Sequence, residues 1–310
     1  MTREEWLRRR TFAGAGFDPD ELLARQRAQG ARVSVALPAR DVADTVGAIV
    51  DAVRSEWTGA RRLVDQIVVI DSGSSDATAC VAAAAGAEVF RAHEIVPGLS
   101  PEPGKGEALW KSLAVVTGDL VIWLDADVEP FDPAFVPGLL GPLLHVPEVA
   151  YVKALYRRDL HGREDDGGRV TEICARPLIN LFYPELAALV QPLAGEAAGR
   201  AAILRQLPFF TGYAVEIGLL VDFWRRFGLA ALAQVDLGQR HHRHQATVAL
   251  GRMGYEIVQA VLDSLAAEGR VPVGPTAAGP YARPVRRDSG FGMETVGREL
   301  VRRPPLSQMW

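Results

Sequence analysis

Two aspartates, Asp125 and Asp127, are separated by one residue and come directly after a short apolar run, Leu120–Leu124. In an extended chain such residues point to the same side, so both carboxylates would face one ligand. Paired carboxylate oxygens suit a hard divalent cation such as Mg²⁺ or Mn²⁺, which bridges and neutralises a diphosphate group. Two aspartates at this spacing also arise by chance, and the preceding apolar run is what favours a metal site for a phosphate leaving group.

A polar loop, Asp71–Asp76, follows a second apolar run and is suited to contact a nucleotide. Its first residues, Asp71 and Ser72, would face the base or the ribose. The alternative is structural, because Ser75 or Asp76 can cap the helix that begins after the loop. One loop can serve both purposes.

Two further glycine-containing segments are suited to anions. Lys105 lies between two glycines at the predicted start of a helix, where backbone N–H groups favour negative charge. Its spacing is not that of a P-loop, and a solvated lysine in a flexible turn is the alternative. Gly168, Arg169 and Thr171 open another predicted helix, and an arginine binds a carboxylate or phosphate with two hydrogen bonds. A loop arginine beside a threonine cap is the alternative there.

The last two signals are a histidine cluster and an isolated acid. Residues 240–244 read Arg-His-His-Arg-His, which suggests metal ligation or phosphate contact, with a solvated polar loop as the alternative. Glu216 stands alone within an apolar run and needs a partner if it is buried. It is otherwise an acid favoured at a helix N-terminus by the helix dipole.

Strands and helices alternate along the first half of the chain, which is typical of βαβ units and a mainly parallel sheet. Strands are predicted at 32–37, 66–70, 87–90 and 119–124, and helices at 44–54, 77–85 and 105–116. Ligands bind at the carboxyl ends of such strands, so the residues after 37, 70 and 124 are expected to meet. The second half predicts strands at 149–156 and 232–237, helices at 171–190 (broken near Pro184), 215–227 and 246–268, and a proline-rich irregular tail at 271–284.

Composition excludes several classes of protein. With 34 basic and 38 acidic residues the formal net charge is −4, which is poor for general binding of nucleic acid or anionic membranes. Two cysteines are too few for a disulfide scaffold or a cysteine zinc site. No apolar stretch approaches about 18 residues and no signal-peptide pattern is present, so we expect no membrane span and a cytoplasmic location.

Together these segments resemble the glucosyl-3-phosphoglycerate synthases of actinobacteria, retaining glycosyltransferases of the GT-A fold. The resemblance runs from about Ser34 to Asp263, and its longest matches are Pro103–Leu113, Gly167–Pro177, Leu207–Asp222 and Ala233–Gly238. It implies an α/β, Rossmann-like GT-A fold, with a mainly parallel sheet flanked by helices. The expected parts are an N-terminal extension (1–30), a nucleotide-sugar-binding half (31–148), an acceptor-binding and catalytic half (149–268) and a C-terminal tail (269–310).

The resemblance also implies a reaction, the metal-dependent transfer of glucose from UDP-glucose to the 2-hydroxyl of 3-phosphoglycerate, with retention, by a homodimer. Implied donor-binding residues are Pro38, Ala39, Asp71, Ser72, Lys105, Asp125 and Ala126; acceptor-binding residues are Gly168, Arg169, Thr171 and His244; metal ligands are Asp125, Asp127 and His242; and Arg240 lies nearby. Glu216, Asp127 and Lys105 are expected to be catalytic. We expect a front-face mechanism in which Glu216 supports the donor sugar without bonding to it.

Three positions depart from the family pattern. Val42 stands where the family has a glutamate that meets the nucleotide, and Asp41 is expected to supply a donor contact instead. His244 replaces an asparagine of the acceptor pocket, and Ala197 replaces a tyrosine. These departures leave two alternatives open: mannosyl transfer from GDP-mannose to 3-phosphoglycerate or a related acceptor, and a non-catalytic protein that binds a nucleotide sugar.

Overall fold

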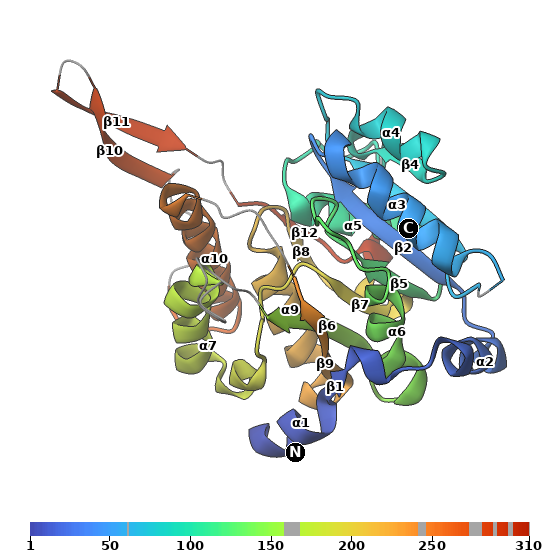
Figure 1. Ribbon diagram of the computed structural model, residues 1–310. Coiled ribbons are helices and arrows are strands. Elements are labelled where there is room, and N and C mark those ends of the chain that lie inside the picture. Colours follow the sequence, from blue (N-terminus) through green and yellow to red (C-terminus); the bar gives the residue numbers. More distant parts are fainter. Residues whose placement is uncertain are drawn as a thin grey trace.

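The computed structural model describes residues 1–60, 62–157, 168–240, 246–272, 281–287, 290–296 and 300–309. Within them, one sheet of eight strands runs through the centre of the molecule in the spatial order β1-β9-β6-β7-β5-β2-β3-β4 (Figure 1). Its strands are β1 Thr11–Ala13, β2 Val33–Ala39, β3 Gln66–Asp71, β4 Glu88–Arg91, β5 Leu120–Trp123, β6 Tyr151–Arg157, β7 Ala197–Arg200 and β9 Leu232–Gln239. Neighbours are parallel except β7, which is antiparallel to β5 and β6. The predicted mainly parallel sheet is confirmed.

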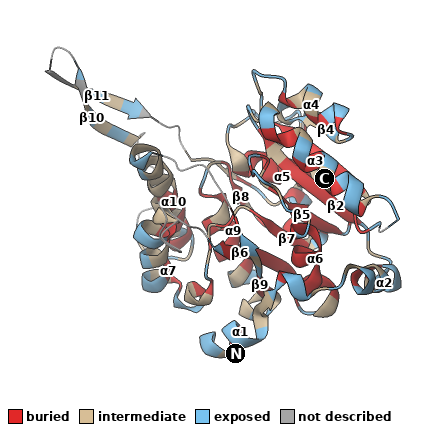
Figure 2. Cartoon of the chain, in the orientation of Figure 1, coloured by how far each residue is buried: buried red, intermediate tan, exposed pale blue. Residues whose placement is uncertain are grey.

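Both faces of this sheet are buried (Figure 2). The helices are α1 Arg3–Arg10, α2 Pro19–Gln29, α3 Ala43–Trp57, α4 Thr78–Ala84, α5 Lys105–Val115, α6 Phe135–His145, α7 Arg176–Phe182, α8 Ala201–Leu204, α9 Val215–Phe227 and α10 Thr247–Ala267. Along β2, Val35 and Leu37 pack into one apolar cluster with α3 and α6, whereas Ala36 packs into a second cluster with α5 and α9. Burial on both faces explains why the strands read as continuous apolar runs.

Two core elements have no counterpart in the prediction. Helix α6 is buried along almost its whole length and contains Pro142 and two glycines, so it shows no amphipathic period. Its glycines permit close packing, since a Cβ on Gly141 would meet the Phe17 ring at 2.3 Å. Strand β7 consists of small residues and an arginine, and its pairing with a strand on each side specifies it better than its own sequence does.

The N-terminal 30 residues are part of the fold. Strand β1 pairs with β9 at the edge of the sheet, and α2 packs beside α6. Trp6 on α1 is fully buried, and its indole Nε1 donates to the carbonyls of Leu229 and Leu232 at 2.9 and 3.0 Å. The pairing of β1 with β9 adds one strand to the sheet, in a segment where the sequence predicted only an extension.

The C-terminal part is less irregular than predicted. Strands β10 (Tyr281–Arg287) and β11 (Gly290–Val296) form an antiparallel hairpin that projects from the body beyond α10 (Figure 1). The chain then returns, and β12 (Arg302–Arg303) pairs with β8 (Phe209–Phe210). The predicted break near Pro184 is confirmed by a 3₁₀ turn that follows α7. In the part of the chain that the structure describes, no helix combines the length and the apolar character needed to cross a membrane.

Candidate active site

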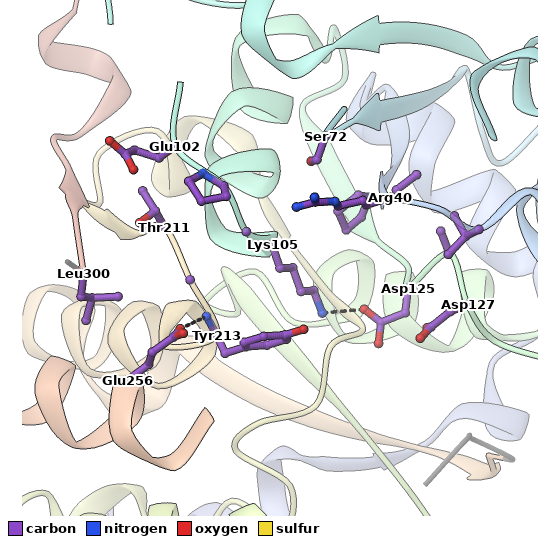
Figure 3. Close-up of a pocket in the computed structure, with 17 residues that line it drawn as sticks. Arg40, Ser72, Glu102, Lys105, Asp125, Asp127, Thr211, Tyr213, Glu256 and Leu300 are labelled. Carbon is purple, nitrogen blue, oxygen red and sulfur yellow. Dashed lines mark hydrogen bonds and ion pairs between the residues drawn. The ribbon is translucent and has the colours of Figure 1, made fainter. Parts of the chain in front are cut away.

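A cavity of about 540 Å³ opens where β2, β3 and β5 end (Figure 3). The expected meeting of these carboxyl ends is therefore confirmed. The opposite wall comes from the start of α5, the segment between β8 and α9, α10 and the C-terminal segment. The lining residues are Pro38, Ala39, Arg40, Val42, Ser72, Glu102, Pro103, Gly104, Lys105, Asp125, Ala126, Asp127, Thr211, Gly212, Tyr213, Glu256 and Leu300.

Lys105 lies at the centre of this cavity, in contact with two carboxylates. Its Nζ is 2.5 Å from Asp125 Oδ1 and 3.0 Å from Glu216 Oε1. Burial by itself would lower the pKa of Lys105, but the charges of Asp125 and Glu216 outweigh burial and raise that pKa above its usual value. Gly195 makes the arrangement possible, since a Cβ there would come within 2.2 Å of Asp125 Oδ2 and 2.4 Å of Lys105 Nζ. Lys105 is thus a fixed cation and not a solvated loop residue.

Arg240 supplies a second cation to the same aspartate. Its Nη2 lies 3.0 Å from Asp125 Oδ2 and 3.8 Å from Asp127 Oδ1. Its Nη1 donates to the Tyr156 hydroxyl at 2.7 Å and to Glu196 Oε2 at 3.1 Å, and Tyr156 itself donates to Glu196 at 2.7 Å. Burial would raise the pKa of Asp125, but Lys105 and Arg240 hold that pKa well below its usual range. Asp125 is therefore ionised and fixed in place.

Asp127 differs from Asp125, because its side chain is 72% exposed and faces the open cavity. No group of three His, Cys, Asp or Glu side chains gathers to hold a metal in the described ranges, and His242 and His244 lie outside them. Mg²⁺ usually takes only one or two carboxylates and completes its shell with water and substrate phosphates. An exposed carboxylate beside a second, fixed one fits that donor set.

One end of the cavity, which we call the nucleotide end, is formed by the last two residues of β2 and by residues that follow β2 and β3. Pro38, Ala39 and Ser72, three of the predicted donor contacts, line this end, and Val42 lines it too. Arg40 also lines it, which the sequence did not indicate (Figure 3). An arginine flanked by alanine and aspartate after a strand looks like any exposed loop residue, and only its position at this edge brings it to the cavity.

Asp41 and Asp71, two of the predicted donor contacts, do not line the cavity. The Asp41 carboxylate accepts hydrogen bonds from Ser75 N at 2.7 Å and Ser75 Oγ at 3.0 Å, which lower its pKa. Asp71 is buried at the end of β3, and its Oδ1 accepts from Ser74 N at 3.1 Å. Both aspartates shape the 72–76 loop, and the contact of Asp41 with a donor stays a prediction. Ala77, and neither Ser75 nor Asp76, occupies the N-cap position of α4, although Asp76 Oδ1 accepts from Thr78 N, the first residue of the helix, at 2.9 Å.

The other end of the cavity, the far end, was not identified from the sequence. It consists of Thr211, Tyr213, Glu256 and Leu300, which come from three separate segments (Figure 3). Tyr213 N donates to Glu256 Oε2 at 2.6 Å, which fixes α10 against the segment before α9. Glu216, predicted from its isolation in an apolar run, lies behind Lys105 and is not part of the lining.

A second cavity, of about 670 Å³, is lined in part by Tyr156. Gly168 and Thr171, two of the predicted acceptor residues, line it together with Arg176. Arg169 stands between them in the chain and is half-buried. Because Tyr156 lines this cavity and its hydroxyl binds Arg240, a single guanidinium links the two cavities. Ala197 packs in the core, 2% exposed, and lines neither cavity.

Proteins of known activity share this architecture. A crystal structure of mannosyl-3-phosphoglycerate synthase from Rubrobacter xylanophilus is 45% identical and superposes with a TM-score of 0.92, covering 100% of this chain and 98% of its own. A crystal structure of glucosyl-3-phosphoglycerate synthase from Mycobacterium tuberculosis, in complex with Mn²⁺, UDP and phosphoglyceric acid, is 39% identical with a TM-score of 0.84, covering 95% and 96%.

Sequence comparison agrees with the structural likeness. Glucosyl-3-phosphoglycerate synthase of Mycolicibacterium smegmatis is 48% identical over 237 residues, which span 75% of this chain and 77% of that protein. The family model described as Glycosyl transferase family 2 matches residues 34–209, which contain the nucleotide end, Lys105 and both aspartates of the D-x-D motif. The chain belongs to glycosyl transferase family 2.

Proposed function

We propose that this protein transfers glucose from UDP-glucose to the 2-hydroxyl of 3-phosphoglycerate, with retention at the anomeric carbon. The observation that carries the proposal is the cavity in which Lys105, Asp125 and Asp127 lie between a nucleotide end and a far end. A donor with its base at the ends of β2 and β3 would place its diphosphate at these three residues. The Mycobacterium tuberculosis relative was crystallised with Mn²⁺, UDP and phosphoglyceric acid, which supports the same donor and acceptor classes here.

Mg²⁺ or Mn²⁺ would be held by Asp127 with Asp125, and by His242 from outside the described residues. Such a cation neutralises negative charge on the departing diphosphate. Lys105 adds a fixed positive charge on the same side of the cavity, already oriented by Asp125 and Glu216. Because these ion pairs exist before substrate binds, little reorganisation is needed when charge develops on the leaving group.

Glu216 is proposed to support the donor sugar through Lys105 and to form no bond to it. Its Oε1 is 3.0 Å from Lys105 Nζ and its side chain is 11% exposed, so an approach to an anomeric carbon would break an ion pair. This placement favours the front-face mechanism, in which the acceptor attacks from the side of the departing diphosphate.

The acceptor is proposed to bind through Gly168, Arg169 and Thr171, with His244 nearby, in or beside the second cavity. Arg240, bonded to Tyr156 on one side and to Asp125 on the other, lies at the boundary where an acceptor from this cavity would meet the donor. An acid that carries phosphate is attracted to the guanidinium of Arg169 and to backbone N–H groups at the start of the helical segment. We further propose that the protein works in the cytoplasm, as a homodimer.

Mannosyl transfer from GDP-mannose is the second candidate function. It is favoured by the mannosyl-3-phosphoglycerate synthase of Rubrobacter xylanophilus, whose structure covers this whole chain at 45% identity. Val42 at the nucleotide end is also compatible with a different base, since it offers no side-chain hydrogen bond.

A panel of donors and acceptors with product mass spectrometry separates these functions. UDP-glucose, GDP-glucose, UDP-mannose and GDP-mannose would each be incubated with 3-phosphoglycerate, D-glycerate and phosphoenolpyruvate, with Mg²⁺ or Mn²⁺. The proposed function requires a hexosyl-phosphoglycerate product with UDP-glucose as the preferred donor. Preference for GDP-mannose would establish the second candidate, and nucleotide-sugar binding without any product would identify a non-catalytic protein.

A further inference from the structure

Glu256 lines the far end of the cavity, away from the nucleotide end. It projects from the middle of α10, and Figure 3 shows it opposite the end lined by Arg40 and Ser72, with Lys105 between. Its Oε2 accepts from Tyr213 N at 2.6 Å. Gly212 permits this approach, because a Cβ there would lie 2.1 Å from the same oxygen.

Glu256 differs from the other two carboxylates near Lys105 in having no ion pair within the part of the chain that the structure describes. Asp125 is paired with Lys105 and Arg240, and Glu216 is paired with Lys105. Among the described residues, no cation forms an ion pair with Glu256, although it is half-buried. Burial, reinforced by the nearby charge of Glu216, raises the pKa of Glu256 even though the hydrogen bond from Tyr213 lowers it. A half-buried carboxylate without a counter-ion is satisfied best by hydroxyl donors from a ligand.

A nucleotide-hexose donor brings such hydroxyls to this place. With its base at the nucleotide end and its diphosphate at Lys105 and Asp127, the donor would extend its hexose toward Thr211, Tyr213 and Glu256, which line the rest of the cavity. Oε2 is already engaged by the backbone, which leaves Oε1 to accept from the sugar. A site built to bond a particular hydroxyl rejects an isomer that lacks it there, since the buried carboxylate would stay unpaired.

We propose that Glu256 reads the hydroxyl pattern of the donor hexose and sets the selectivity between sugar epimers. The inference deepens the proposed function and rests on it, because it requires a nucleotide-hexose donor. Tyr213 then acts as a positioning residue, whose backbone N–H fixes the carboxylate for this contact.

The experiment compares binding of UDP with binding of three UDP-hexoses by calorimetry, in wild type, Glu256→Ala and Glu256→Gln. UDP-mannose and UDP-galactose each differ from UDP-glucose at one hydroxyl. Glu256→Ala should leave the affinity for UDP unchanged. It should lower the affinity for the preferred UDP-hexose by about 10- to 150-fold, the loss expected for a hydrogen bond to a charged group. The affinity ratio between epimers should narrow toward one.

Glu256→Gln keeps an oxygen that accepts from Tyr213 N, removes the charge and replaces Oε1 with an NH₂ group, which donates and cannot accept from a sugar hydroxyl. It should lose about 5-fold in affinity for the preferred hexose, and it serves if the alanine variant does not fold. Glu56→Gln, the same change on the exposed face of α3, is the matched control and should behave as wild type. Initial rates with the same donors should show that the ratio of kcat/KM between sugar epimers also narrows toward one.

Equal losses of affinity for UDP and UDP-hexose would show that Glu256 only shapes the 211–213 segment, and would overturn the inference. Unchanged epimer selectivity in both variants would overturn it as well. In either case wild-type turnover would leave the proposed function standing. Wild type that binds no nucleotide sugar would instead overturn the proposed function, and the inference with it.

Discussion

The nucleotide end and the far end of the cavity are built in different ways. The nucleotide end consists of loops that continue directly from β2 and β3, so the parallel sheet alone brings its residues together. The far end joins α10, the 211–213 segment and Leu300, which are distant in sequence. It depends on the C-terminal segment, because Thr211 N donates to Val301 O at 3.0 Å and β12 pairs with β8. One end is therefore a property of the sheet, and the other is a property of tertiary docking.

The largest effect on turnover is expected from the loss of Asp127, which lies between the two ends of the cavity. Asp127→Ala deletes the exposed carboxylate proposed to hold the cation, and turnover should fall by at least about 10³-fold with little change in the free energy of unfolding. The measurement is product formation at saturating donor and acceptor, with urea unfolding as the control for fold. Chelation should inactivate wild type and Mg²⁺ or Mn²⁺ should restore it; full activity after chelation would contradict the metal role.

Arg303→Ala should affect the far end of the cavity more than the nucleotide end. Arg303 Nε and Nη2 bind the Glu107 carboxylate at 2.7 and 2.9 Å, and both side chains are buried. Loss of one partner of a buried pair costs about 3–5 kcal/mol, but Glu107 keeps Lys111 as a second partner at 3.1 Å, so the free energy of unfolding should fall by less than that amount. Below the unfolding transition, UDP-glucose affinity should fall more than UDP affinity, because α5 and the far end lose their support.

The double variant Arg303→Ala/Glu107→Ala is the control for this effect. Because it also leaves the buried Lys111 without its carboxylate, it should be less stable than Arg303→Ala, which shows how much Glu107 still contributes in the single variant. If UDP and UDP-glucose affinities fell together in Arg303→Ala, the two ends would not be independent.

A third, smaller effect concerns the acceptor and should leave both ends of the donor cavity untouched. Arg169→Ala should raise the KM for 3-phosphoglycerate by about 10- to 150-fold, since a charged hydrogen-bond partner is worth about 1.5–3 kcal/mol. Steady-state kinetics with each substrate varied in turn provide the measurement. Weaker donor binding with an unchanged acceptor KM would contradict the prediction, because it would show that Arg169 serves the donor and not the acceptor.

The smallest effects are expected at the nucleotide end. Asp41→Ala should lower the affinity for UDP-glucose by about 2- to 10-fold. The carboxylate that accepts hydrogen bonds from Ser75 and so shapes the loop is lost, together with any direct contact between Asp41 and the donor. Val42→Ala should change almost nothing. Calorimetry with UDP-glucose and GDP-mannose tests both variants. Unchanged affinity in Asp41→Ala together with strict selectivity for one base would rule out both a direct and an indirect role for Asp41.

Local sequence predicted the nucleotide end because its signals are local. Apolar runs marked β2, β3 and β5, and polar residues after each run marked the ligand edge. The same logic missed α6, whose burial on all sides removes the amphipathic period, and β7, whose small residues acquire strand structure from their neighbours. It also missed the hairpin after residue 280, where prolines favoured an irregular tail.

The sequence by itself determined the parallel α/β sheet, the edge at which ligands bind and the chemical types gathered there. Periodicity and strand–loop order are sufficient for these, since the carboxyl ends of parallel strands must meet. Only the tertiary structure decided that Lys105 and Arg240 converge on Asp125, that Glu216 stands behind Lys105, and that Glu256 faces the far end. Those contacts join residues far apart in the chain, and packing between elements, which leaves no periodic trace in the sequence, brings them together.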